Sequence, residues 1–125
     1  MMAFSFGNAC FDTPHSEETI YLVTAPKALY ASRDDFVSQA LKFLDSDDEL
    51  RCFWTEEFRE RVYTPVSDEE REWLKSRLEK LSQKITIVHD PVLSAVHISP
   101  PEWNDMTVVM ETDAEYIFYS WGTSV

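Results

Sequence analysis

Glycine is scarce in this sequence of 125 residues, which contains two glycines and six prolines. Loops that cradle phosphate groups need several glycines close together, because the backbone must approach the phosphates. The familiar nucleotide-dependent chemistries are therefore disfavoured. The same scarcity, with an aromatic fraction of 14%, argues against a flexible or low-complexity chain. We see no internal repeat and expect a single domain over residues 1–125.

Cysteine and histidine are also few. Cys10 and Cys52 lie far apart in the sequence and show none of the close spacings used by zinc or redox sites, so we expect two reduced, inert thiols. His89 and His97 could face each other across neighbouring strands, with Asp90 nearby as a third metal ligand. Nothing in the sequence fixes that convergence. We therefore expect neither a metal nor another cofactor, and we favour a protein that is not an enzyme.

Long apolar runs are missing. No stretch approaches the roughly 20 apolar residues that a membrane helix needs, and Met1 is not followed by a charged and then apolar leader. We therefore expect a soluble, cytoplasmic protein that does not bind membranes.

Basic residues are outnumbered, with 11 Lys and Arg against 23 Asp and Glu, so the formal net charge is −12. Such a surface repels nucleic acid and anionic membranes, so we expect no direct nucleic-acid binding. After Lys84 there is neither a Lys nor an Arg, so the acids of the C-terminal third have no basic residue near them in sequence. This charge-biased end is the most informative feature of the chain.

Aromatic residues of the types enriched at protein interfaces are interleaved with these acids. An acidic surface with aromatic anchors would attract a basic protein and speed the encounter. The alternative is a solvated acidic surface whose aromatics belong to the core. The candidate partner-binding residues are Trp103, Asp105, Glu111, Asp113, Glu115 and Tyr116.

A β-hairpin is predicted over residues 105–121, because two stretches rich in β-branched and aromatic residues flank a polar break at residues 112–114. Met106, Val108 and Met110 share one face of the first strand, and its opposite face is also apolar. Strands that are apolar on both faces lie inside a sheet with something packed on each side, or with one side held for a partner.

The remaining elements follow from local patterns. Ser32 and the two acids after it predict a helix over residues 33–44. After a capping box of Ser46 and Glu49, apolar residues recur every four positions at Leu50, Trp54, Phe58 and Val62, which predicts a second helix over residues 50–62 that ends before Pro65. Residues 50–54 could instead form a short strand. A further capping box, Ser67 with Glu70, predicts a helix to about residue 83. Predicted strands cover residues 19–25, 85–89 and 94–99, and residues 1–17 are expected to form a strand or an ordered arm.

A second acidic cluster lies where the first two predicted helices meet, and it comprises Asp45, Asp47, Asp48 and Glu49. Capping of the second helix accounts for most of it. Asp45 is the exception, because it lies at the unfavourable end of the first helix dipole.

This order of elements predicts an α+β fold rather than alternating βαβ units. We expect a mostly antiparallel sheet of four to five strands, ending in a C-terminal meander, with about three helices packed on one face.

The charge and the aromatics together favour a small acidic protein-binding module. The leading hypothesis is an inhibitor or immunity-type protein that covers the basic surface of a toxin or nuclease-like partner. One alternative is a small enzyme or ligand-binding domain with a pocket that uses His89 and His97. Another is a homodimeric structural subunit that associates through an apolar sheet face.

Overall fold

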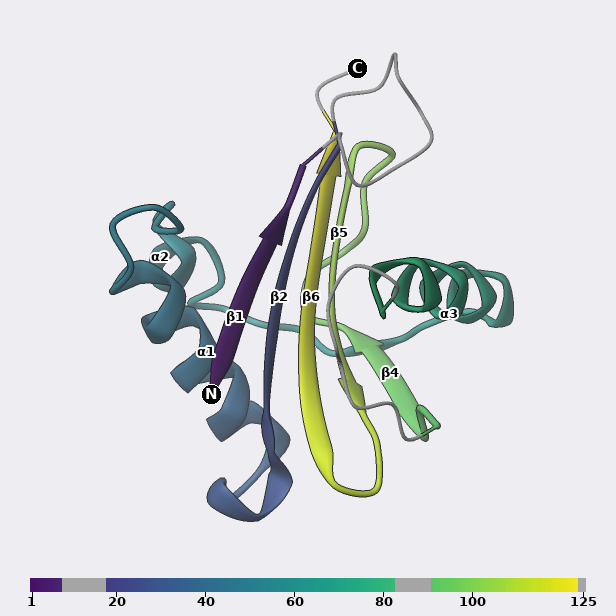
Figure 1. The fold of residues 1–125 in the computed structure, drawn as a ribbon, viewed down its shortest axis with the longest axis horizontal. Helices are drawn as coiled ribbons and strands as arrows, with labels where there is room; N and C mark the ends of the chain where they lie inside the picture. Colours follow the sequence, from purple (N-terminus) through teal and green to yellow (C-terminus); the bar gives the residue numbers. More distant parts are fainter. Residues whose placement is uncertain (8–17, 83–90, 124–125) are drawn as a thin grey trace.

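A six-stranded antiparallel sheet forms the centre of the protein, in the order β1-β2-β6-β5-β4-β3 (Figure 1). The computed structural model describes residues 1–7, 18–82 and 91–123. The strands are β1 (Met2–Phe6), β2 (Glu18–Pro26), β3 (Thr64–Pro65), β4 (Ser94–His97), β5 (Asp105–Glu111) and β6 (Glu115–Thr123). The helices of these residues are the short η2 (Lys27–Leu29), α1 (Arg33–Asp45), α2 (Trp54–Glu57) and α3 (Asp68–Ser82).

The predicted C-terminal hairpin is confirmed, since β5 and β6 pair antiparallel with Val109 opposite Phe118. Its turn is held by Thr112, whose amide donates to the Glu115 carbonyl over 2.9 Å and whose hydroxyl oxygen accepts from the Glu115 amide over 3.0 Å. Together with β4, which pairs with β5, the hairpin forms the expected antiparallel meander.

At the centre of the sheet, a strand from early in the sequence pairs with a strand from late in it. β6 lies between β5 and β2 and pairs with β2 along its whole length, from Glu18 opposite Thr123 to Pro26 opposite Glu115. β2 also pairs with β1, which forms one edge of the sheet. The sheet thus has six strands, one or two more than the sequence predicts.

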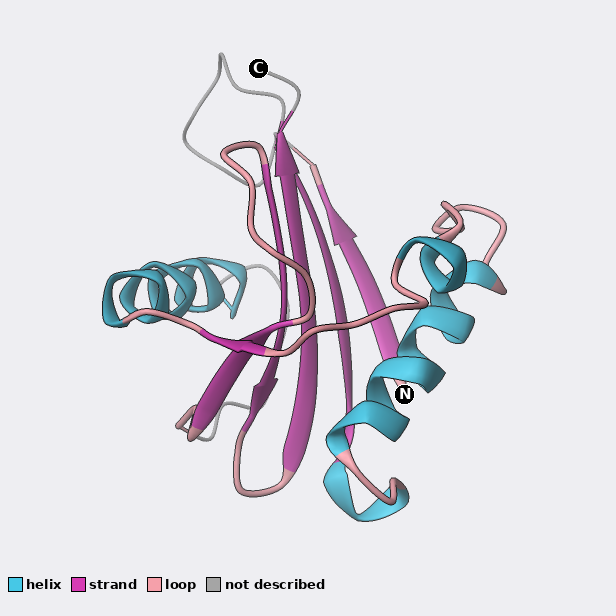
Figure 2. Ribbon diagram, turned by 180° about the vertical axis from the view of Figure 1, so that it is seen from behind, coloured by secondary structure: helices cyan, strands magenta, loops and turns pink. Residues whose placement is uncertain are grey.

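Helices cover both faces of the sheet, which corrects the prediction that they pack on one face (Figures 1 and 2). On one face Leu74, Leu78 and Leu81 of α3 pack in a core with apolar residues of β2, β5 and β6. On the other face α1 and α2 pack in a second core. The hairpin strands are apolar on both faces, so both faces need cover: Val108 and Val109 point to opposite faces, and both are fully buried.

Both long helices begin where the sequence predicts. The Ser32 hydroxyl oxygen accepts from the Asp35 amide over 3.1 Å and caps α1. At the start of α3 the Ser67 hydroxyl oxygen accepts from the Glu70 amide over 3.1 Å, and the Ser67 amide donates to the Glu70 carboxylate over 2.9 Å. This reciprocal pair is the capping box that the sequence indicated.

The second predicted helix is present only as the short α2, so its predicted extent over residues 50–62 is wrong, and the alternative strand over residues 50–54 does not form. Helix α2 covers four residues, and Phe53 before it has a left-handed backbone with φ 55°. The Ser46–Glu49 capping box does not form, because the Glu49 amide donates to the Asp47 carboxylate over 2.8 Å instead of to Ser46, whose hydroxyl donates to the Phe43 carbonyl.

Some predictions fall outside the described residues. The predicted strand at residues 85–89, including His89, lies outside them, and so do Asp90 and Cys10. Most of the predicted arm at residues 1–17 also lies outside them, and strand β1 belongs to its described part. In the part of the chain that is described, no helix is long and apolar enough to cross a membrane.

Candidate functional site

A tight turn just before β5 presents an exposed tryptophan, Trp103. Glu102 and Asp105 form an antiparallel bridge, with Trp103 and Asn104 between them. The Asn104 carbonyl also accepts from the Thr123 amide over 2.9 Å, which ties the turn to the end of β6. Trp103 is 76% exposed on this supported turn. A large aromatic side chain in water, on a fixed backbone, is typical of an interface anchor.

On the α2 side of the sheet a pocket of about 400 Å³ lies beside this turn. Among the described residues, its lining includes three carboxylic acids, Glu57, Glu102 and Asp105, and no Lys or Arg. Aromatic residues also line it, namely Tyr21, Trp54, Phe58 and Trp121. The lining hydroxyls of Thr107 and Ser120 bond to each other over 2.9 Å. We call this hollow the acidic pocket, and its chemistry suits a cationic group.

A second, shallower hollow of about 330 Å³ lies on the α3 side, and it shares Glu102 and Trp121 with the acidic pocket. Glu69 and Glu70 also line it, together with Trp73. The one base among the described residues that line it is Arg77, which bonds the buried Glu18 over 3.0 Å and stacks over the Trp73 ring. This arginine is therefore already engaged, and the acids around it are in excess.

The four tryptophans of the chain gather around this end of the sheet. Trp54 and Trp121 border the acidic pocket, Trp73 and Trp121 border the second hollow, and Trp103 stands on the turn that contains the shared Glu102. Trp73 and Trp121 meet edge to face at 5.4 Å between ring centroids. We call the turn and its two hollows the Trp103 surface.

The structure brings Trp103 and Asp105 together but places the other candidate residues at the opposite end of β5. Asp113 is exposed and Glu115 half-buried there, next to the hairpin turn. Tyr116 is buried and stacks on Phe36 with ring centroids 5.2 Å apart, so its ring belongs to the core.

Glu111, also at that opposite end, is not free of basic partners as the sequence suggested. Lys27 lies 2.6 Å from its carboxylate. The hydrogen bond from Lys27 holds the pKa of Glu111 below its usual value, and the same bond raises the pKa of Lys27. Lys27 comes from the segment after β2, so sequence distance concealed this pair.

His97 is buried in the core on the α3 side, where its Nε2 lies 3.1 Å from the Glu70 carboxylate. Because a carboxylate accepts only, Nε2 carries the proton. The Ser67 amide, and after it His97, holds the pKa of Glu70 below its usual value, outweighing its partial burial. Within the described residues no three His, Cys, Asp or Glu side chains are grouped to hold a metal, and Cys52 is an exposed free thiol.

The sequence candidates did not include the other acids and aromatics of the Trp103 surface. Glu102 and Trp121 belong to the charge-biased C-terminal third but were not selected, and Trp54 and Glu57 lie within the predicted second helix. The available signal was the Trp103 turn itself, where an acid and a tryptophan follow two prolines. Comparisons of the chain with protein-family models, with curated proteins and with solved structures each gave no match. The geometry of this surface therefore carries the functional argument.

Proposed function

We propose that this chain is a protein-binding module, and specifically an inhibitor or immunity-type protein that covers a basic partner surface of the kind that nucleases present. The observation that carries the proposal is the exposed Trp103 on a supported turn, flanked by a pocket with three acids and no basic residue. In this proposal Trp103 is the anchor, and the acidic pocket receives an arginine or lysine side chain of the partner.

The chemistry of the acidic pocket favours an arginine. A guanidinium group can stack on aromatic faces while its N–H groups bond carboxylates, and it holds less water than an ammonium group. The acidic pocket offers aromatic residues such as Trp54 and carboxylates such as Glu57 and Asp105. A neutral ligand would leave these carboxylates without a counter-charge.

The charge of the whole chain supports the same partner class. With a net charge of −12 the protein attracts cationic surfaces and speeds their approach, and salt weakens that effect. Cationic clefts are general in enzymes that act on nucleic acid, because the phosphate backbone must be held. An acidic surface can occupy such a cleft in place of the substrate.

The test compares three proteins as bait in the lysate of the source cell: the wild type, Trp103→Ala, and Leu93→Ala as a control with a comparably exposed apolar side chain. We expect one basic protein to be retained in stoichiometric amount by the wild type and the control, to be released by salt, and to be lost with Trp103→Ala. Equal retention by all three baits would exclude the Trp103 surface.

A second experiment uses the purified partner to find which acidic residues speed its association with this protein. Glu102→Lys with Asp105→Lys changes the charge at the Trp103 surface, and Asp113→Lys with Glu115→Lys makes the same change at the hairpin turn. We expect the first pair to slow association at least tenfold more than the second at low salt. If the hairpin-turn pair slows association more, the acids near residue 113 form the site instead.

A further inference from the structure

Strand β1 forms one edge of the sheet, and no described strand lies on its outer side. Residues 1–7 contain no charged side chain, although the chain as a whole carries 11 basic and 23 acidic residues. Within β1, Met2 and Ser5 are exposed. A neutral, apolar edge strand is a template for pairing with another strand, and proteins that avoid such pairing place charges or proline there.

The opposite edge of the sheet shows that protection. β3 is two residues long and contains Pro65, which cannot donate to a further strand. β1 has five residues and neither a proline nor a lysine. The two edges of one sheet thus differ in the features that decide whether an edge pairs.

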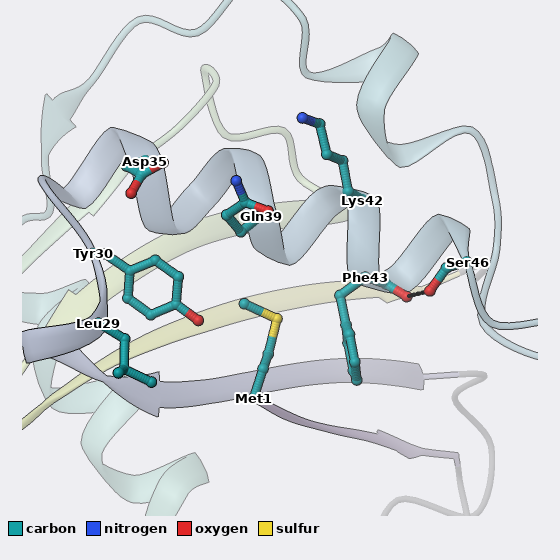
Figure 3. A pocket seen from close by; sticks show the side chains of 8 residues that line it. All are labelled: Met1, Leu29, Tyr30, Asp35, Gln39, Lys42, Phe43 and Ser46. Atoms are coloured by element: carbon teal, nitrogen blue, oxygen red, sulfur yellow. Dashed lines mark hydrogen bonds between the residues drawn. The ribbon is translucent and has the colours of Figure 1, made fainter.

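An open hollow of about 430 Å³ lies beside β1, between α1 and the start of the chain, and apolar and polar residues line it in equal number (Figure 3). Figure 3 shows the Met1 side chain pointing toward α1 and the Phe43 side chain pointing away from α1 beside it, with Leu29 and Tyr30 at one end. Leu29 is 69% exposed and Phe43 is 39% exposed. Exposed apolar side chains are therefore concentrated next to the unprotected edge.

We infer that β1 pairs antiparallel with β1 of a second copy of this chain, which joins two sheets across a twofold axis and covers the exposed apolar side chains at the hollow beside each strand. A twofold axis suits this strand, because an antiparallel pair of identical strands presents the same residues from both sides. The inference is independent of the proposed function, and β1 and the Trp103 turn belong to different parts of the sheet.

Charge is the reason for choosing a second copy as the occupant. Two chains of net charge −12 repel each other over most of their surfaces, so a stable contact needs a patch without excess charge. The β1 edge is such a patch. The hollow beside it carries one charge of each sign, Asp35 and Lys42, so two copies can meet there without a net like-charge contact.

The experiment measures the molar mass of the full chain by sedimentation equilibrium over micromolar to submillimolar concentrations. The edge variant carries Met2→Lys and Ser5→Lys, two exposed positions that tolerate lysine. The matched control carries Val62→Lys and Leu93→Lys, which add the same charge at other exposed positions. Circular dichroism establishes that each variant is folded.

We expect the wild type and the control to reach the dimer mass as concentration rises, and the edge variant to stay monomeric. Amide hydrogen exchange at Ala3–Phe6 should also slow with concentration in the wild type, because the outer amides become hydrogen bonded. A wild type that is monomeric throughout overturns the inference and leaves the edge to a different protein or to none. Dimerisation unaffected by the edge lysines, or abolished equally by both variants, overturns it as well.

Discussion

Glu70 stabilises two parts of the protein with one carboxylate. One oxygen accepts from the Ser67 amide and closes the cap of α3, and the other lies 3.1 Å from Nε2 of the buried His97 on β4. The side chain therefore links the start of a helix to a strand of the sheet. The sequence predicted the first contact, because Ser67 and Glu70 have capping-box spacing, but not the second.

Replacement of Glu70 by alanine should lower the free energy of unfolding by about 1–2 kcal/mol at pH 7, because the Ser67 amide and Nε2 of the buried His97 lose their acceptor. The pKa of Glu70 lies below its usual 4.5 in the folded protein. Its contribution is therefore fully present above about pH 4.5 and is lost as the pH falls through the lower folded value.

Urea unfolding of the wild type and of Glu70→Ala between pH 7 and pH 3 checks this. The difference between them should shrink below about pH 4.5. The control is Glu69→Ala, an exposed neighbour in the same turn, which should stay within about 0.5 kcal/mol of the wild type. A constant difference across the pH range would contradict the role of the ionised carboxylate.

At the scale of elements, α2 is a short helix whose start is held from a distance. The Asp45 carboxylate, at the end of α1, accepts from the Trp54 and Thr55 amides, each over 2.8 Å. Burial alone would raise the pKa of Asp45, but these hydrogen bonds outweigh it and lower the pKa. This explains an acid that is unfavourable for its own helix dipole, because it caps the next helix.

Replacement of Asp45 by alanine should destabilise the protein by about 1–2 kcal/mol, since two amides of α2 lose their acceptor. The control is Asp48→Ala, whose side chain is 94% exposed and lies 3.8 Å from Arg51. That change should be nearly neutral. Thermal unfolding of the three proteins checks the prediction. A control as destabilised as Asp45→Ala would mean that the lost charge, and not the cap, is responsible.

The failure of the predicted helix over residues 50–62 has a physical cause. The four-residue recurrence of Leu50, Trp54, Phe58 and Val62 was real for the middle pair, which is buried, whereas Val62 is 66% exposed. The chain is not helical at residues 61–63, and the side chains on either side of Val62 bond Asp34 of α1. Tertiary contacts of the Arg61 guanidinium and the Tyr63 hydroxyl therefore set the conformation of this segment, which local periodicity could not predict.

For the whole molecule, local signals predicted the hairpin, the two long helices and the α+β class. They could not predict that β2 and β6 pair, because that contact joins opposite ends of the sequence. Nor could they gather Trp54, Glu57 and Asp105 around one pocket, since three separate segments supply these residues. Local sequence patterns are therefore enough to predict the fold class of this protein, but they are not enough to predict its candidate site.

The excess of acids should make stability depend on salt. Raising sodium chloride from about 0.01 M to about 0.1 M shortens the screening length from about 30 Å to about 10 Å, so repulsion among the acids weakens. We therefore expect the Tm to rise. Potassium chloride should give the same rise, because screening does not depend on the cation. A fall in Tm would mean that ion pairs such as Arg77–Glu18 outweigh the repulsion.

The central place of β6 has a consequence for synthesis on the ribosome. Trp121 of β6 donates to Glu18 of β2 across 103 positions of the sequence, and β6 fills the gap between β2 and β5. Until β6 emerges, both of those strands have a bare edge, and neither core is closed. The sheet therefore cannot be completed strand by strand as the chain emerges. Trp121 of β6 also borders both hollows of the Trp103 surface, so this surface is incomplete until β6 has joined the sheet.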